Sequence, residues 1–308
     1  MPKMHQLRYF IALADTLSFS KAAALCHVTQ PTLSAQIKEL EERLQVQLVE
    51  RSRSFVFLTP IGMEIAVRAR AIIAQTEDIR EIARGTKNEQ LSGTLQMGVV
   101  QTLGAYVLSL AVPKLRKKYP DLRLSVWEDR IESLPVKLLE GAHDLMLIPS
   151  KPQHAELTSM MLMREPFQIV MPYDHPLAHQ SSINSSDLNG QTLLSMDRSG
   201  VVYNQMHRLC AEVGASFVTD YAGATLDTLR KMVAARMGIS LLPALYVRSD
   251  VLREKLVVAR PLSFDGPSRE IHMVWRQSSP RHAKYLDFAK LISECLAPWD
   301  AGETGVGN

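Results

Sequence analysis

Residues 28–41 read VTQPTLSAQIKELE, and the fold of the N-terminal region can be predicted from them. Pro31 stands where the first turn of a helix tolerates proline. Apolar residues then recur at spacings of four, three and four, namely Leu33, Ile37, Leu40 and Leu44. This spacing predicts one buried stripe on a helix that runs to about residue 44. A shorter helix over residues 21–26, with Ser20 as its N-cap, is expected before it. Two short helices joined by a tight turn are typical of a helix-turn-helix motif.

The charges around this motif favour contact with a polyanion. No acidic residue lies between Asp15 and Glu39, whereas Lys21 and Lys38 lie in that segment. A second acid-free window, residues 51–63, carries a short apolar run before its proline and glycine. This pattern predicts a wing hairpin, so that residues 1–62 are expected to form a winged helix-turn-helix domain.

A long helix is expected next, as a linker and dimerisation element over residues 63–88. From Met63 to Thr86 no residue other than Gly85 interrupts the helical pattern. Residues suited to a coiled-coil seam recur at alternating spacings of four and three: Ile65, Ala69, Ile72, Thr76, Ile79 and Ala83. A solitary helix would leave this stripe exposed, and a homodimer is therefore expected.

From residue 92 onward, strands and helices alternate. Strands are expected at residues 95–100, 122–127, 144–148, 168–171, 217–222, 239–242 and 271–276. Helices are expected at residues 105–119, 133–140, 203–213, 225–236 and 283–296. The alternation is typical of a mainly parallel α/β architecture.

We expect this effector-binding domain to span residues 89–300 and to contain two lobes. The first lobe is assigned residues 92–165 and 268–300, and the second lobe residues 166–267. The glycine-rich tail, residues 301–308, is expected to be disordered.

Length and composition exclude several classes of protein. The 308 residues exceed a typical single domain. No stretch approaches the ~20 apolar residues of a membrane helix, and the N-terminus lacks a secretory signal pattern. The three cysteines, Cys26, Cys210 and Cys295, are too widely separated for a disulfide framework or a metal site. A cytoplasmic protein without a membrane partner is therefore expected, and its net charge of +3 does not by itself indicate nucleic-acid binding.

Common enzyme motifs are absent from the sequence. It contains no HExxH, no phosphate-binding GxxxxGK and no GxSxG. His175 and His179 are four residues apart, but Pro176 between them predicts a turn rather than a metal-binding helix. We therefore expect no enzymatic activity, no catalytic or metal-ligating residue and no cofactor. A solute-binding protein would share the two lobes, but it would have a signal peptide and no helix-turn-helix.

Three blocks resemble the LysR-type transcriptional regulators: residues 22–23, residues 28–41 and LTPIG at residues 58–62. The blocks follow the family's order and spacing, and the resemblance extends over essentially the whole chain. It implies α/β architecture with an N-terminal winged helix-turn-helix, a long dimerisation helix and an effector domain similar to periplasmic binding proteins. It further implies promoter DNA, a small-molecule effector and other copies of the chain as partners, in a dimer or a tetramer. RNA polymerase is an additional candidate partner, and activation and repression both remain open.

Further stretches look like the peroxide-sensing OxyR branch of this family. They are residues 26–28, 30–34, 101–106, 228–235 and 238–245. That branch uses a reactive cysteine nine residues before a resolving cysteine. Cys210 matches the resolving position, but Val201 stands nine residues earlier. This departure counts against a thiol–disulfide switch of that kind.

The residues expected to contact DNA are Gln30, Pro31, Thr32, Ser34, Lys38, Arg51, Arg53 and Thr59. The first three lie at the N-terminal end of the second helix, which usually points into the major groove. Gln30 suits adenine and Ser34 suits either donor or acceptor edges, whereas the basic residues suit phosphates. Ala35 stands where many family members have Arg, which removes a guanine contact worth about 1–3 kcal/mol. The alternative for each polar residue is a solvated surface side chain.

The residues expected to contact the effector are Gln101, Thr102, Arg130, Ser150, Ser199, Val201 and Thr225. Most follow a predicted strand or begin a predicted helix, where free amides and the helix dipole favour an anion. A small polar or anionic ligand in the cleft between the lobes is therefore expected. The alternative for each residue is a turn-capping hydroxyl or a surface charge.

An oxidant-sensing role is the alternative function. Its candidates are Cys210 and the methionines Met160, Met161, Met163, Met196, Met206, Met232 and Met237. Methionine is more often an adaptable core residue, and a thiol on an apolar helix face is more often inert. Cys26 is expected to be a small buried apolar residue.

Overall fold

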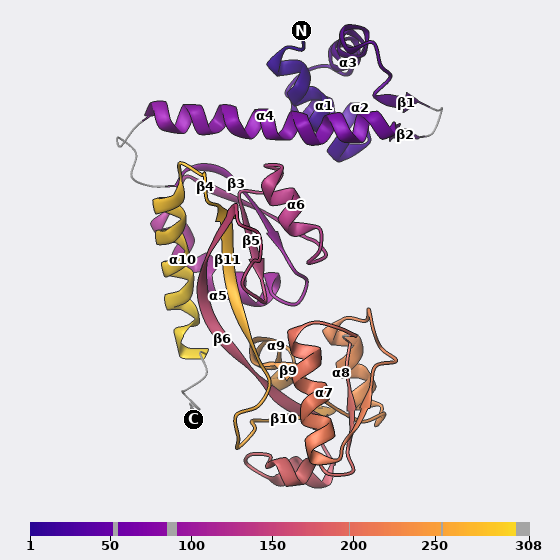
Figure 1. Ribbon diagram of the computed structural model, residues 1–308, viewed down its shortest axis with the longest axis vertical. Helices are drawn as coiled ribbons and strands as arrows, with labels where there is room; N and C mark the ends of the chain where they lie inside the picture. The colour runs from indigo at the N-terminus through magenta and orange to yellow at the C-terminus, as the bar shows by residue number, and fades with distance from the viewer. Residues whose placement is uncertain (52–54, 85–90, 197, 254, 300–308) are drawn as a thin grey trace.

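The computed structural model describes residues 1–51, 55–84, 91–196, 198–253 and 255–299. A helical N-terminal domain and one long helix lie above an elongated α/β body of two lobes (Figure 1). Among the described residues, no helix is both long and apolar enough to span a membrane.

The N-terminal domain is a winged helix-turn-helix, as predicted. Phe10, Leu33 and Ile37 are fully buried in its core. The short helix expected at residues 21–26 begins two residues earlier, at Phe19. The reason is that the Ser18 hydroxyl, rather than that of Ser20, accepts the capping hydrogen bond from the Lys21 amide. The elements are α1 (Met4–Thr16), α2 (Phe19–Leu25), α3 (Gln30–Leu44) and an antiparallel ribbon of β1 (Val49–Arg51) and β2 (Val56–Leu58).

Helix α4 (Pro60–Arg84) is the predicted long helix, and it begins three residues before the expected position. Its N-terminus is held by Thr59, whose buried hydroxyl donates to the Gln47 carbonyl at 2.7 Å and accepts from the Gly62 amide at 2.9 Å. The predicted coiled-coil seam has two parts: one part is buried within this chain, and the part nearer the C-terminal end of α4 is exposed. Ala69 is buried against the N-terminal domain, whereas Ile72 and Ile79 are exposed. The side chain of Ala83 lies outside the described residues.

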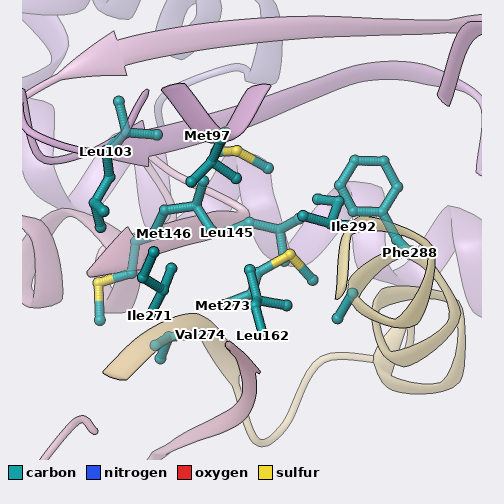
Figure 2. Packing of buried hydrophobic residues seen from close by; sticks show 14 of the residues in the cluster. Met97, Leu103, Leu145, Met146, Leu162, Ile271, Met273, Val274, Phe288 and Ile292 are labelled. Atoms are coloured by element: carbon teal, nitrogen blue, oxygen red, sulfur yellow. The ribbon is translucent and has the colours of Figure 1, made fainter. Parts of the chain in front are cut away.

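The first lobe surrounds a large apolar core. Met97, Leu145, Met273 and Phe288 meet there from three strands and the last helix (Figure 2). Strand β3 pairs in parallel with both β4 and β5, as the alternating pattern predicts. The elements are β3 (Gly93–Val99), α5 (Gly104–Lys118), β4 (Leu122–Glu128), α6 (Leu134–Leu139), β5 (Leu145–Ile148), β11 (Ser268–Arg276), α10 (His282–Leu296) and η5 (Ala297–Trp299).

The second lobe is connected to the first by two long antiparallel strands, β6 (Leu157–Pro172) and β11. Only residues 168–171 of β6 are expected to be a strand from the sequence, because its first half carries no simple alternation of apolar and polar residues. The other elements are η2 (Pro176–His179), η3 (Ser185–Leu188), β7 (Thr192–Leu194), α7 (Val201–Val213), β8 (Ser216–Val218), α8 (Leu226–Ala234), β9 (Ile239–Pro243), α9 (Ala244–Ser249), η4 (Val251–Arg253) and β10 (Val257–Arg260).

One nine-stranded sheet runs through both lobes in the order β4-β3-β5-β11-β6-β9-β7-β8, with β10 paired to β6. The pairs of β6 with β9, β10 and β11 are antiparallel, so the sheet is less parallel than expected. The reason is that the two connecting strands run in opposite directions between the lobes. This arrangement leaves the ends of β3, β5 and β7 close to the junction of the lobes.

Candidate DNA interface and inter-lobe cavity

The N-terminal end of α3 presents polar residues to solvent. Gln30, Pro31 and Thr32 are exposed, and Ser34 is half-buried. The Thr29 hydroxyl caps the helix by accepting from the Thr32 amide. The Gln30 Oε1 accepts from the Ser20 hydroxyl at 2.7 Å, which holds the Gln30 amide at the start of the helix.

Of the three basic residues expected at the DNA interface, the structure describes the side chain of Lys38. Lys38 is 74% exposed in its side chain and lies 3.7 Å from the Glu42 carboxylate. Arg51 ends β1, but its side chain lies outside the described residues, as does Arg53 altogether. Thr59 differs from the expectation, because it is buried and uses its hydroxyl to begin α4. It positions the helix and offers no free surface to a phosphate.

The ribbon of the wing carries an aromatic pair to which the sequence analysis assigned no role. Phe55 and Phe57 are exposed, and their rings stack at a centroid distance of 5.9 Å. Residues two apart on a strand share a face, so the spacing could have indicated this pair.

A small cavity of about 110 Å³ lies between the two lobes. A water molecule occupies roughly 30 Å³ in the liquid, so the cavity has room for a few heavy atoms. Its polar lining consists of Thr102, Ser195 and Arg269. The rest is apolar: Pro149, Phe167, Met196, Val202, Met206, Leu226, Leu229, Leu241, Leu242 and Pro243.

Arg269 organises a buried polar network at the junction of the lobes. Its Nε donates to Glu165 Oε2 at 2.7 Å, while Nη1 and Nη2 donate to the hydroxyl and the carbonyl of Thr102, each at 2.9 Å. The fully buried Glu165 also accepts from the Leu245 amide at 2.8 Å. The loop after β3 is thereby tied to β6, β11 and the start of α9.

Thr102 is the predicted effector residue that lines this cavity. The other six do not line it: Gln101, Arg130, Ser150, Ser199, Val201 and Thr225. Three of them miss it by one residue, because Thr102, Pro149 and Val202 line the wall next to Gln101, Ser150 and Val201. Adjacent residues on a strand or helix point in different directions, so a shift of one position changes which side chain faces the ligand.

Thr225 has a structural role. Its hydroxyl caps α8 by accepting from the Thr228 amide at 3.2 Å. The residues that sequence reasoning missed, Arg269, Glu165 and Ser195, lie on strands or directly after one, and they carry no local motif.

Cys210 is buried on α7 beside Met206 and Leu209. Burial raises the pKa of its thiol to about 11, so the reactive thiolate is scarce near neutral pH. The candidate methionines are scattered. Met196 and Met206 line the inter-lobe cavity, Met161 and Met237 are exposed, Met163 is buried, and Met160 and Met232 are half-buried.

The two structural units correspond to two known domains. Residues 4–63 match the bacterial regulatory helix-turn-helix protein, lysR family, and residues 88–297 match the LysR substrate binding domain. The chain belongs to the LysR family. It is a LysR-type DNA-binding transcriptional regulator with an effector-binding domain, as the sequence resemblance implies.

Several LysR-family relatives are peroxide regulators. The chain is 34% identical to the DNA-binding transcriptional dual regulator OxyR of Escherichia coli K12 over 94% of each chain. It is 33% identical to a hydrogen peroxide-inducible genes activator of Dickeya chrysanthemi, over 94% of this chain and 95% of the relative.

Solved structures agree with this relationship. A full-length OxyR variant from Pseudomonas aeruginosa superposes with a TM-score of 0.75 at 35% identity, covering 96% of this chain and 99% of the other. A hydrogen-peroxide-bound OxyR mutant from Corynebacterium glutamicum gives a TM-score of 0.63 at 27% identity, covering 98% and 94%.

Proposed function

We propose that this regulator binds promoter DNA through α3 and the wing, as a dimer that assembles into a tetramer. A small polar effector in the inter-lobe cavity modulates this binding. The observation that supports the proposal is the cavity itself, which lies between the lobes beside the buried network of Thr102, Glu165 and Arg269. Because relatives are named as activators, activation of transcription through contact with RNA polymerase is the proposed output.

The position of the cavity explains how a ligand would act. Strands β6 and β11 pass beside it from one lobe to the other, and Arg269 lies on β11. A ligand that competes for the Thr102 hydroxyl would disturb a network that reaches the second lobe through the hydrogen bond from the Leu245 amide to Glu165. It shifts the arrangement only to the extent that it binds one arrangement better than another.

The chemistry of the cavity favours a small neutral polar ligand over an anion. Arg269 is its only basic lining residue among those described, and the guanidinium already faces the Glu165 carboxylate. An anion would therefore meet an occupied cation and apolar walls. Hydrogen peroxide has the right size and polarity, and the relative from Dickeya chrysanthemi and one solved structure are named for it.

The test uses the full-length protein with a panel of small polar molecules that includes hydrogen peroxide. A ligand at about 100 times its Kd should raise the free energy of unfolding by about 2.7 kcal/mol, which thermal unfolding detects readily. Anisotropy with the chain's own upstream DNA then reports the change in promoter binding. Thr102→Val should abolish both responses, whereas Ser199→Ala, outside the cavity, should retain them. Responses that survive Thr102→Val would refute the site.

An oxidant-sensing role is a second candidate, because Met196 and Met206 both line the cavity. Oxidation would place polar sulfoxides on its apolar wall and alter the packing of the lobes. DNA footprints recorded before and after hypochlorite should then differ, and Met196→Leu with Met206→Leu should remove the difference. Cys210→Ser should not, since its thiol is buried and protonated. Identical footprints in the parent protein would eliminate this candidate.

A further inference from the structure

A second and larger cavity, about 910 Å³, lies between the N-terminal part of the chain and the first lobe. One wall comes from α1 and α4, and the other from β3, β4 and the turn between α6 and β5 (Figure 1). Its volume falls within the range of about 300–1,000 Å³ that is usual for ligand sites. The proposed inter-lobe effector site does not include it.

His143 is the central observation in this cavity. The residue is 4% exposed, and neither ring nitrogen makes a hydrogen bond. Its Nε2 lies 3.6 Å from Asp129 Oδ2, beyond hydrogen-bonding distance. Buried polar groups almost always have a partner, and a neutral imidazole offers one acceptor and one donor. The ring is packed closely, since a Cβ at Gly98 would lie 2.6 Å from His143 Cδ2.

The basic groups that line the cavity are already engaged. Arg70 pairs with Asp15, and Lys137 donates to Asp129 at 2.7 Å. Arg276 donates to two backbone carbonyls, and Arg281 is also engaged. An anionic ligand would therefore find no cation in this lining that lacks a partner.

The acceptors, in contrast, have capacity left. Within the described part of the chain, the Glu140 carboxylate makes no hydrogen bond or ion pair. Asp144 accepts from the Gln96 amide through Oδ2 only. Together with the ring of His143, these groups favour a ligand rich in N–H donors.

Trp127 adds an aromatic surface at the same wall. Its Nε1 donates to Gln96 Oε1 at 3.0 Å and to the Ser125 hydroxyl at 3.2 Å, which fixes the indole. The residue nevertheless remains 53% exposed. Tryptophan faces attract cations more strongly than other aromatic side chains do.

We propose that this cavity binds a small organic cation, a primary amine or guanidinium on an apolar body. Its N–H groups would donate to Glu140 and, after a small shift of the side chains that cover the ring, to His143, and its body would lie against Trp127. This site is additional to the inter-lobe effector site. It would bind an organic cation, whereas the inter-lobe site is proposed to bind a small neutral polar ligand.

The position of the site gives such a ligand a route to DNA binding. The two walls nearly touch at Gly141, where an added Cβ would lie 2.6 Å from the Ala74 Cβ on α4. A bound cation would link α4 to the first lobe and favour the arrangement in which these walls face each other. The orientation of the DNA-binding domain would change accordingly.

The experiment titrates the full-length protein with three probes of the same shape: benzylamine, benzyl alcohol and benzoate. Calorimetry and tryptophan fluorescence should show saturable binding of benzylamine, at least about tenfold tighter than the other two. Glu140→Gln and His143→Leu should each weaken benzylamine binding by about tenfold or more. Glu156→Gln, an exposed acid elsewhere on this lobe, and Thr102→Val, in the inter-lobe cavity, should leave it unchanged.

The histidine variant also tests the unpartnered ring without any ligand. Leucine removes a buried polar group that makes no hydrogen bond, so the Tm of His143→Leu should equal or exceed that of the parent. A lower Tm would mean that the imidazole has a structural partner, and would remove the main support for the site. Absence of saturable benzylamine binding, equal binding of all three probes, or binding unaffected by both variants would overturn the proposal.

Discussion

Arg269 shows how one side chain can hold together three segments at the junction of the lobes. Its guanidinium contacts Glu165 on β6 and both the hydroxyl and the carbonyl of Thr102 after β3. The Arg269 and Glu165 side chains are 5% and 0% exposed, so the pair is removed from water. Ionic groups in such a place are expensive to bury, and each depends on the other for compensation.

Arg269→Leu should destabilise the protein by about 3–5 kcal/mol, because it leaves the buried Glu165 charge without its partner. Urea unfolding of the full-length protein measures the change. Arg164→Leu is the matched control, since Arg164 forms an exposed pair with Glu270 worth about 0–1 kcal/mol. The double variant with Glu165→Leu should recover part of the loss. Equal losses of unfolding free energy for Arg269→Leu and Arg164→Leu would contradict this account.

Cys210 should make stability depend on alkaline pH. Burial raises the pKa of its thiol from 9.0 to about 11, so the folded state keeps the proton where the unfolded state loses it. The free energy of unfolding should therefore fall as the pH rises from 9 to 11. Cys210→Ala should show a shallower fall in Tm over this window. Tyrosines titrate in both proteins, so the difference between the two curves is the readout, and parallel curves would disprove the assignment.

At the level of elements, α3 is the helix whose exposed face the sequence predicts most directly. Leu33, Ile37 and Leu40 are fully buried, which turns Gln30 and Lys38 toward solvent. The same logic works only in part for α4. Its first turns pack against α1, and its apolar stripe becomes available to a partner only beyond Ala69.

Lys38→Ala should weaken binding to all DNA sequences alike and lower the salt dependence of that binding. Each phosphate contact contributes about 0.9 to the slope of log K against log salt concentration, so the slope should fall by about one. Anisotropy titrations at several salt concentrations measure it. Lys290→Ala, an exposed lysine on α10, is the control. An unchanged slope would exclude a phosphate contact by Lys38.

Ile79→Asp should dissociate the dimer, because it places a carboxylate on the exposed part of the α4 stripe. Analytical ultracentrifugation at several protein concentrations gives the mass directly. Leu252→Asp is the control, because it places a carboxylate at a similarly exposed position of the second lobe: Leu252 is 67% exposed and Ile79 is 64% exposed. Only the change on α4 should alter the mass. A dimer that persists in Ile79→Asp would place the interface elsewhere.

At the scale of the whole molecule, both cavities lie where structural units meet. The smaller cavity lies between the two lobes, and the larger one lies between the first lobe and helices α1 and α4. Junctions of this kind are common ligand sites, because motion of the units changes their shape. In both proposals a ligand at the junction would act on the relative positions of the DNA-binding domains.

Two paired DNA-binding domains should protect two half-sites whose centres lie about 10 base pairs apart, or a multiple of that spacing. DNase I footprinting on the chain's own upstream region measures the spacing. In Ile79→Asp the second half-site should lose protection at protein concentrations that still fill the first. If Ile79→Asp protects both half-sites together at every protein concentration, pairing of the DNA-binding domains does not depend on α4.

The winged helix-turn-helix, the long helix and the alternating α/β order could all be predicted from the sequence. Helix faces depend on residues three and four apart, and caps on residues two or three apart, so this information is local. Even there, Thr59 shows a limit, because its role in beginning α4 depends on the Gln47 carbonyl twelve positions away.

Which side chains meet at the two cavities depends on long-range contacts that appear only in the folded chain. Arg269 contacts Thr102 across 167 positions and Glu165 across 104. The place of Thr102 after a strand could be predicted, but no local pattern marks Arg269 or Glu165. His143 likewise becomes notable only because folding buries it without a partner. Contacts of this kind arise from the direction of β6 and β11 and from one-residue differences in facing, as between Val201 and Val202. Those depend on how the whole sheet twists and pairs, which short-range spacing does not encode.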